Sequence, residues 1–393
     1  MATASPPAEP TYVQRPTLRA RLQRFWRRVT EGLELTQLWS QFETEARASY
    51  RLYSRDVAAK TPEGLTRRGH HLHVIKEFFW AVLEKLSPAR RVLLLAALVM
   101  LVFPSSGFSY HDSANEFHSV ELDFHFWGGL LLFLLLMLEI ADRVVMKRDL
   151  QIAREIQTWL LPGAPPQIPG VSLAYITRPA NTVAGDYYDV FPRPGKTNED
   201  SRVVFAVADV AGKSIPAAML MATFQASLKT LSSAQVALPE LVANMNKYAC
   251  SNSQGGLRFT TAFLAEYDAA RRVFTYINAG HNNPILRRSN GTIERLDVGG
   301  LPLGIMAEAK YESASVALVP GDWLVIFTDG VVEAANAKNE EYDEPRLLRT
   351  LDAGASSTPK ELLDRLMADL DLFVGATPQH DDVTCLLIKA ESS

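Results

Sequence analysis

The sequence has few cysteines and little net charge. Its 393 residues include two cysteines, Cys250 and Cys385, which lie far apart in the chain without the spacing of metal ligands. They suit two reduced thiols in a cytosolic fold, and they exclude a disulfide framework or a cysteine-ligated zinc site. The formal net charge is −4, so the overall charge gives no reason to expect a nucleic acid partner.

The N-terminus lacks the apolar stretch of a secretory signal. Residues 1–16 are polar and rich in proline, and we predict that they are disordered. Residues 17–31 carry five arginines interleaved with apolar side chains, which predicts an amphipathic basic helix. Such a helix suits an anionic membrane surface or, equally, a solvated helix that packs on its neighbours. Residues 17–90 as a whole predict a helical N-terminal region without a recognisable motif.

No apolar run reaches the length of about 20 residues that usually spans a bilayer. The run 92–110 has 19 residues without a formal charge, and the run 124–138 has 15. Their flanks nevertheless follow the positive-inside pattern, because Lys and Arg lie outside the pair and the loop between them is acidic. We therefore predict that residues 91–141 form a two-helix membrane hairpin with both ends in the cytoplasm. The alternative is a buried helical hairpin in a soluble domain, while a channel would need more spans.

Residues 142–163 predict a charged linker helix. Ile152, Ile156 and Trp159 fall on one face of it, and Pro162 and Gly163 end it. The apolar stripe would form the seam of a homodimer or pack on the following domain, and too few heptads exist to choose.

Beyond the linker, short β-branched and aromatic runs replace the helical pattern. The predicted strands are 171–178, 187–191, 202–208, 261–267, 272–278, 284–288, 313–319, 322–328 and 383–389. The predicted helices are 214–232, 238–253, 345–352 and 358–374. Because most strands follow one another without helices between them, we expect antiparallel sheets. Residues 164–393 therefore predict one α+β domain, an antiparallel β-sandwich flanked by helices on both faces.

Four aspartates stand at the ends of apolar, strand-like runs or in turns beside them: Asp186, Asp209, Asp329 and Asp381. One Asp-Gly pair is ordinarily a turn. Four such carboxylates are harder to explain that way, because a buried carboxylate is costly unless it is paired or bound to a metal. Mg²⁺ and Mn²⁺ prefer carboxylate oxygens, and a two-metal hydrolytic site needs several in one cleft. The pattern predicts a divalent metal site.

Ala211-Gly212-Lys213-Ser214 is similar to the end of a phosphate-binding loop. That motif also needs a glycine five residues before the Gly-Lys pair, and position 207 is a valine. We therefore reject a nucleotide-phosphate loop here.

Seven short motifs occur in order and together resemble one family. They are Ile156-Gln157-x-x-Leu160-Leu161-Pro162, Gly185-Asp186-Tyr187-Tyr188-Asp189, Ala208-Asp209-Val210-x-Gly212-Lys213, Asn278-Ala279-Gly280-His281-Asn282-x-Pro284, Gly304, Thr328-Asp329-Gly330 and Asp381-Asp382-x-Thr384. The set, over about residues 150–390, resembles the PPM-type (protein phosphatase 2C-like) serine/threonine phosphatases. Within them it is most similar to the SpoIIE/RsbU-like bacterial regulatory branch.

The resemblance implies two Mn²⁺ or Mg²⁺ ions at one end of two packed antiparallel sheets. By motif, Asp209 would bridge both ions, and the backbone carbonyl of Val210 would bind the second. Asp329 and Asp381 would hold the first ion, and Asp186 would act through a metal-bound water or as a further ligand. Two cations lower the pKa of a bridging water and neutralise phosphoryl charge, so no protein nucleophile is needed.

Four further residues have roles that the resemblance leaves open. Eukaryotic members bind phosphate with an arginine near their first strand; Arg178 is the candidate here, although the SpoIIE-like branch lacks that residue. His281 would be a general acid or would order a loop beside the site. Asp189 and Asp382 adjoin proposed ligands and are candidates for orienting them.

The predicted function is a membrane-anchored, metal-dependent phosphoserine/phosphothreonine protein phosphatase with its phosphatase domain in the cytoplasm. By resemblance, its substrate would be a phosphorylated signalling protein such as an anti-sigma factor antagonist. The alternative is a non-catalytic phosphatase-fold sensor or scaffold at the membrane. Loss of ligand carboxylates would be its sign, and all four are present.

Overall fold

A computed structural model gives the fold of most of the chain. It describes residues 80, 83–84, 86–104, 106–111, 117–164, 166–193, 202–234, 236–253 and 258–392. The predicted disorder of residues 1–16, and nearly all of the predicted helical region 17–90, lie outside the described residues. The chain divides into two compact units, residues 1–141 and residues 142–393, and each is described by itself.

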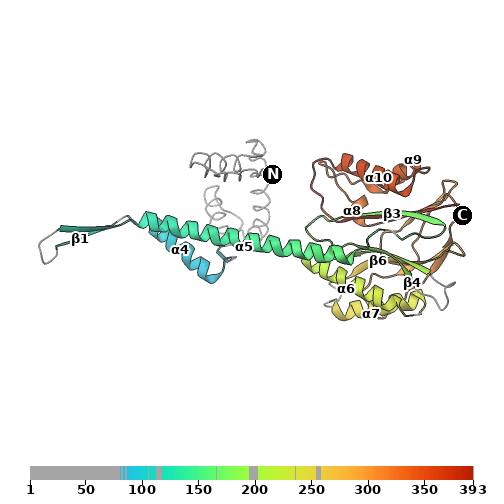
Figure 1. Cartoon of the computed structure of the whole chain (residues 1–393), viewed down its shortest axis with the longest axis horizontal. Helices are drawn as coiled ribbons and strands as arrows, with labels where there is room; N and C mark the ends of the chain where they lie inside the picture. Colours follow the sequence, from blue (N-terminus) through green and yellow to red (C-terminus); the bar gives the residue numbers. More distant parts are fainter. Residues whose placement is uncertain are drawn as a thin grey trace, which may run out of the picture. The chain divides into compact units, whose positions relative to one another are not determined.

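In the described part of the first unit, a helix and the start of a longer one are joined by a β-hairpin (Figure 1). Helix α4 (Pro88–Val102) begins with a proline, whose fixed φ suits the first turn of a helix. The antiparallel strands β1 (Ser106–His111) and β2 (Phe117–Leu122) follow, and then α5 (Phe124–Leu160) begins. The two helices pack closely, because a Cβ on Gly128 would lie 3.0 Å from the carbonyl oxygen of Ala97. Arg90 and Glu139 join them by an ion pair of 3.3 Å.

The predicted transmembrane hairpin is not supported. Within the part of the chain that the structure describes, no helix combines the length and the apolar character needed to cross a membrane. Helix α4 ends after 15 residues. Pro104 follows it and strand β1 begins two residues later, so the first apolar run divides between a helix and a strand.

The second unit is a sandwich of two sheets. The six-stranded sheet has the order β10-β7-β6-β5-β4, with β11 also on β7. Its strands are β4 (Tyr187–Arg193), β5 (Arg202–Val210), β6 (Thr260–Asp268), β7 (Val273–Ala279), β10 (Gly299–Gly300) and β11 (Ala314–Ala317). The five-stranded sheet has the order β3-β13-β12-β8-β9. Its strands are β3 (Val171–Arg178), β8 (Ile285–Arg287), β9 (Ile293–Arg295), β12 (Trp323–Phe327) and β13 (Val383–Ala390).

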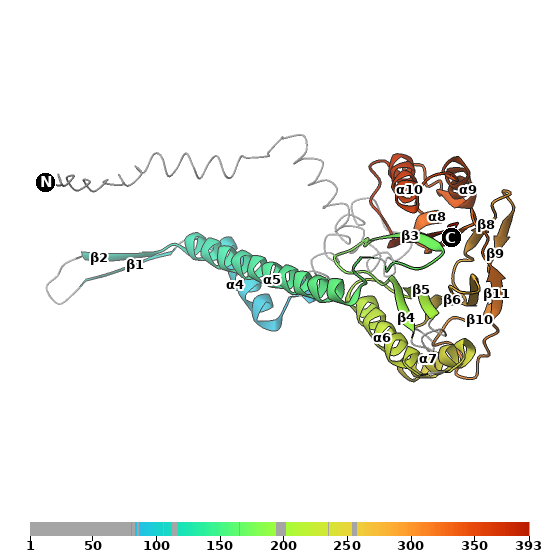
Figure 2. The ribbon, with the colours of Figure 1, turned by 45° about the vertical axis from the view of Figure 1, so that its right-hand side comes forward.

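Helices cover both outer faces of this sandwich (Figure 2). Helices α6 (Ile215–Ser232) and α7 (Leu238–Asn252) pack on the six-stranded sheet. Helices α8 (Asp329–Val332), α9 (Asp343–Ala353) and α10 (Pro359–Val374) pack on the five-stranded sheet. A third core lies between the two sheets. The α+β sandwich flanked by helices is therefore confirmed, with one parallel pairing, β10 with β7, among antiparallel ones.

The layers explain why the strands leading to the aspartates are continuously apolar. Every residue of β12 is buried, because one face meets the opposite sheet and the other meets helices. Strand β5 is buried from Val204 to Ala208 for the same reason. Such strands lose their alternation, and a polar residue appears where the strand leaves the core.

Candidate functional site

Four elements bring the predicted aspartates to one end of the sandwich. Asp209 lies near the end of β5, and Asp329 opens α8 directly after β12. Asp381 lies just before β13, and Asp186 just before β4. Strands β4 and β5 belong to one sheet, and β12 and β13 belong to the other. The four aspartates therefore lie where the two sheets converge. The hydroxyl of Thr328 joins the two sides, donating to Asp186 at 2.8 Å.

We call these four residues the Asp cluster (Asp186, Asp209, Asp329, Asp381). Their carboxyl groups act on one another electrostatically. Burial raises the pKa of Asp209 to about 7, and the charges of Asp329 and Asp381 add to this effect. Burial, together with the charge of Asp209, raises the pKa of Asp186 well above its ordinary value. The pKa of Asp329 is raised by burial and by Asp381. The residues therefore form a concentration of negative charge that a cation would relieve.

The donor chemistry fits hard divalent cations, which take carboxylate and carbonyl oxygens. The carbonyl oxygen of Val210 faces the same loop as Asp186, because a Cβ on Gly185 would lie 3.2 Å from it. Yet no group of three or more His, Cys, Asp and Glu side chains in the described ranges is arranged closely enough to hold an ion as it stands. The assignment of Asp186, Asp209, Val210, Asp329 and Asp381 as ligands stays a prediction.

Asp382 holds the loop that carries Asp186. It is buried, and its carboxylate accepts from the backbone nitrogens of Ala180 at 2.7 Å and Gly185 at 2.6 Å. Its own backbone lies against α8, since a Cβ on Gly330 would approach the carbonyl oxygen of Asp382 to 2.0 Å. Asp382 thus ties three chain segments together beside the Asp cluster.

Gln157 holds the same loop from the other side, and sequence reasoning assigned it no role. Its side chain is buried at the end of α5, donating to the carbonyl of Ala184 at 2.7 Å and accepting from the nitrogen of Ala184 at 2.9 Å. Ala184 is two residues before Asp186. The only signal in the sequence was the place of Gln157 in the first of the seven motifs.

His281 is buried behind the Asp cluster. Its Nδ1 lies 3.1 Å from the hydroxyl of Thr261, which in turn lies 3.5 Å from the carbonyl oxygen of Asp209. The backbone nitrogen of His281 donates to Asn278 at 2.7 Å. Burial lowers the pKa of His281 to about 4, so the ring is neutral at pH 7. A neutral, enclosed imidazole suits the ordering of this loop better than proton donation.

Two predicted residues are engaged elsewhere. Asp189 is buried against α6, where it accepts from the hydroxyl of Tyr187 at 2.6 Å and pairs with Lys229 at 2.7 Å. Arg178 forms a two-bond pair with Asp371 of α10, at 2.5 and 3.0 Å. The structure brings neither side chain into contact with the Asp cluster.

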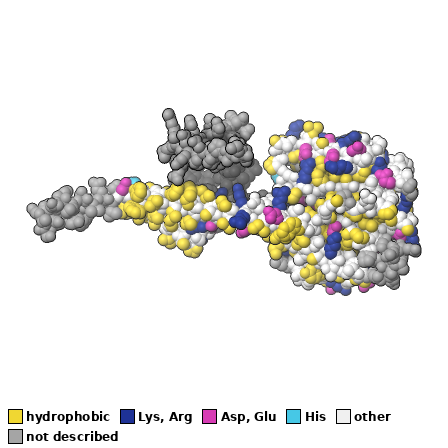
Figure 3. Space-filling model, viewed as in Figure 1, with side chains coloured by type: hydrophobic (Ala, Val, Ile, Leu, Met, Phe, Trp, Pro, Cys, Tyr) yellow, Lys and Arg dark blue, Asp and Glu magenta, His cyan; other side chains and the backbone are white. Residues whose placement is uncertain are grey.

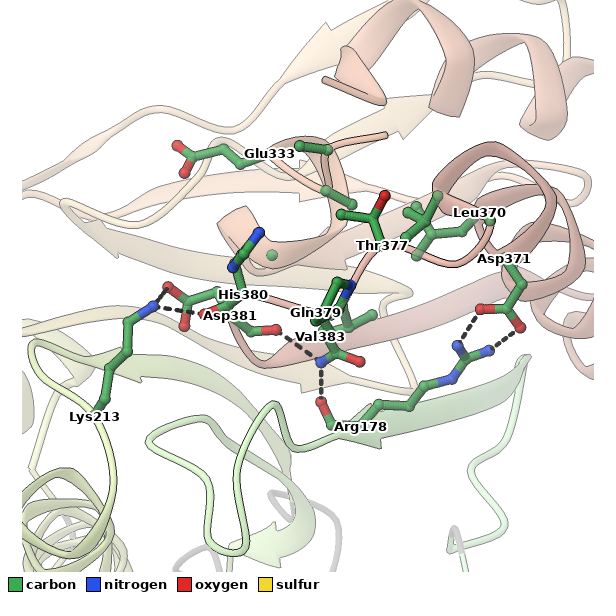
Figure 4. A pocket seen from close by; sticks show the side chains of 16 residues that line it. Arg178, Lys213, Glu333, Leu370, Asp371, Thr377, Gln379, His380, Asp381 and Val383 are labelled. Carbon is green, nitrogen blue, oxygen red and sulfur yellow. Dashed lines mark hydrogen bonds and ion pairs between the residues drawn. The ribbon is translucent and has the colours of Figure 1, made fainter. Parts of the chain in front are cut away.

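A pocket of about 430 Å³ opens beside the Asp cluster (Figure 4). Asp381, His380 and Lys213 line one end of it, and Arg178 with Asp371 lines another part. The amine of Lys213 lies 3.0 Å from Asp381 and donates to the carbonyl of His380 at 2.6 Å. Apolar walls come from residues such as Leu370, Val374 and Val383. The pocket has the size of a small-molecule or side-chain site.

Comparison with known proteins finds a family model that matches part of the chain, and a similar fold. The family model of Stage II sporulation protein E (SpoIIE) matches residues 199–391. Phosphoserine phosphatase RsbU of Bacillus subtilis is 28% identical over 245 residues, which cover 62% of this chain and 70% of RsbU. Protein IcfG of Synechocystis sp. is 27% identical over 277 residues, covering 64% of this chain and 42% of IcfG. The chain thus spans less than half of IcfG.

A solved structure supports the fold. The SiaA-PP2C domain of Pseudomonas aeruginosa superposes with a TM-score of 0.53 at 20% identity, covering 64% of this chain and 99% of that domain. At this identity the likeness shows a PP2C-like fold and nothing further about chemistry.

Proposed function

We propose a metal-dependent mechanism for this chain, which is a protein serine/threonine phosphatase. Its C-terminal part is a PPM-type phosphatase domain of the SpoIIE/RsbU-like branch. In this mechanism the Asp cluster binds two Mn²⁺ or Mg²⁺ ions. The observation that carries the proposal is the convergence of carboxylates whose pKa values are raised by burial and by one another. Bound ions would supply an activated water and neutralise phosphoryl charge.

The chain's own residues have two tasks in this proposal. The half-buried carboxylates of Asp209, Asp329 and Asp381 would hold the ions, and they lie at strand ends that the core holds rigidly. Asp382 and Gln157 fix the loop of Asp186 through four backbone hydrogen bonds. A rigid support of this kind matters because small displacements of a catalytic group slow a reaction strongly.

We propose a phosphorylated signalling protein as the substrate. RsbU carries the name of a phosphoserine phosphatase, and the match to this chain extends over 70% of it. The pocket beside the Asp cluster is lined by half-exposed side chains such as Lys213 and Asp381, so a protein surface can approach it. An anti-sigma factor antagonist, which is a small phosphorylated regulator, is the class of substrate that we would test first.

The metal mechanism is tested with the purified full-length chain. We expect hydrolysis of p-nitrophenyl phosphate and of a phosphoserine protein only with Mn²⁺ or Mg²⁺, and loss of both activities in Asp209→Asn and Asp329→Asn. Asp364→Asn, an exposed site on α10, is the matched control and should stay active. Robust turnover in excess chelator would contradict the mechanism. Metal binding without any hydrolysis would instead favour the sensor or scaffold alternative.

We further propose a homodimer through α5. The side chains of Ile152, Ile156 and Trp159 are 45%, 48% and 78% exposed, so they do not pack on the domain as the second alternative required. Exposed apolar residues on one helical face suit a second copy of the same helix. Light scattering should give a dimer for the wild type and a monomer for Ile156→Glu; a monomeric wild type would refute the seam.

Attachment to a membrane stays a proposal. Apolar side chains cover much of the described surface of α4 and the first half of α5 (Figure 3). They include Val92, Leu95, Val99, Val102, Phe126, Leu130, Phe133 and Leu134, which are exposed. Large exposed apolar surfaces mark interaction sites for lipid or protein. Fractionation of cells with the full chain and with a chain lacking residues 90–141 tests this, and an unchanged distribution would refute it.

A further inference from the structure

Lys213 lines the pocket where it meets the Asp cluster. It lies in the loop between β5 and α6, four residues after Asp209. Its amine lies 3.0 Å from Asp381 and donates to the carbonyl of His380 at 2.6 Å, at one end of the pocket (Figure 4). The side chain is 55% exposed, so the amine can move within the pocket.

Arg178, the other Lys or Arg that lines this pocket among the described residues, is not available for that role. Its guanidinium already pairs with both oxygens of Asp371, which fixes the planar group on α10. Lys213 has three donors on a flexible stem, and a point charge of this kind binds phosphate without a fixed geometry.

The negative charge around the pocket favours a cation at the position of Lys213. Asp381 and Glu333 line the pocket and Asp329 lies close to Glu333, so a phosphoryl dianion that approaches them meets repulsion. The ammonium of Lys213 lies among these carboxylates, 3.0 Å from Asp381. Its charge therefore already acts on the carboxylates that the substrate would approach.

We propose that Lys213 binds the phosphoryl group of the substrate at the end of this pocket next to Asp381. The inference rests on the proposed phosphatase function. The amine lies 3.0 Å from Asp381. A carboxylate that held a cation would attract this ammonium less strongly, which would leave the amine to the phosphoryl oxygens. Lys213 thus takes the task for which Arg178 was the candidate.

Orthophosphate binding separates this role from a structural one. The probes are Mn²⁺ alone and inorganic phosphate with Mn²⁺ present, measured by calorimetry on the full chain. The variants are Lys213→Met, Lys213→Arg and the control Lys360→Met, whose lysine pairs with Asp364 on the surface of α10. We expect Lys213→Met to weaken orthophosphate binding about tenfold, equivalent to about 1.4 kcal/mol. Mn²⁺ affinity should not fall, and Lys213→Arg should recover most of the loss.

Kinetics provide the second measurement. Loss of a phosphoryl contact should raise the KM for p-nitrophenyl phosphate and the inhibition constant of orthophosphate together. Unchanged orthophosphate binding in Lys213→Met would overturn the inference, and so would a parallel loss of Mn²⁺ affinity, since Lys213 would then merely position Asp381. A wild-type chain without metal-dependent turnover would instead defeat the proposed function, which keeps the two failures apart.

Discussion

Replacement of Gln157 by leucine tests whether the end of α5 positions the Asp186 loop. The side chain forms two hydrogen bonds with one residue, Ala184, at 2.7 and 2.9 Å, and it is 6% exposed. Leucine has nearly the same volume and helix propensity but no donor or acceptor. The change therefore leaves the N–H and the carbonyl of Ala184 without partners while it preserves the packing.

The magnitude follows from those two groups. A buried backbone group that loses its partner costs about 1–3 kcal/mol, so the pair predicts a loss of about 2–6 kcal/mol if the loop keeps its place. A loop that moves to reach water avoids part of this cost, but it then displaces Asp186. We therefore expect lower stability, weaker Mn²⁺ binding, or both.

Denaturant unfolding, Mn²⁺ titration and turnover of p-nitrophenyl phosphate measure these effects on the full chain. Gln151→Leu is the matched control, because Gln151 is exposed on the same helix and undergoes the same change of side chain. If Gln157→Leu equals Gln151→Leu in all three measurements, the two hydrogen bonds contribute nothing and the reasoning is wrong.

Three further predictions concern the same end of the sandwich. Gly330→Ala should lower the melting temperature and abolish turnover, because its Cβ would lie 2.0 Å from the carbonyl oxygen of Asp382. The control Gly163→Ala should do neither, because a Cβ there has no neighbour within 4 Å. Asp382→Asn should destabilise the fold by about 1–3 kcal/mol in denaturant titrations, since its amide cannot accept from both Ala180 and Gly185 as the carboxylate does; equal stability would contradict this role. The pKa of Asp209 is raised to about 7. Between about pH 4 and pH 7 the metal-free folded protein therefore binds more protons at this group than the unfolded chain does, so the group's contribution to stability rises as the pH falls. Asp209→Asn should consequently raise the melting temperature of metal-free protein at pH 8 and raise it less at pH 5; a constant difference would show that the pKa is ordinary.

The order of elements in the phosphatase unit could be read from the sequence with good accuracy. The predicted strand 171–178 coincides with β3, and the predicted helix 358–374 differs from α10 by one residue at its start. These segments carry strong local signals, because a covered sheet needs β-branched and aromatic residues and an amphipathic helix repeats every 3.6 residues. Short elements without such a signal were missed, among them the two-residue β10 and the four-residue α8.

The predicted membrane hairpin is not supported by the described helices, for a related reason. Flanking charge and hydropathy are averages over a segment, and they do not indicate where a helix ends. Pro104 and the small residues after it end α4 after 15 residues, and β1 follows.

The sequence by itself determined that carboxylates stand at the ends of buried strands, because that pattern is local. Only the tertiary structure decided which of them can share a site. The contacts that matter join distant residues: Gly185 with Asp382 across 197 positions, and Lys213 with His380 across 167. Asp189 and Asp382 both adjoin a proposed ligand, yet one faces α6 and the other supports the Asp186 loop. Neighbouring residues on a strand or turn point in different directions, and the direction that meets the site depends on how the two sheets pack.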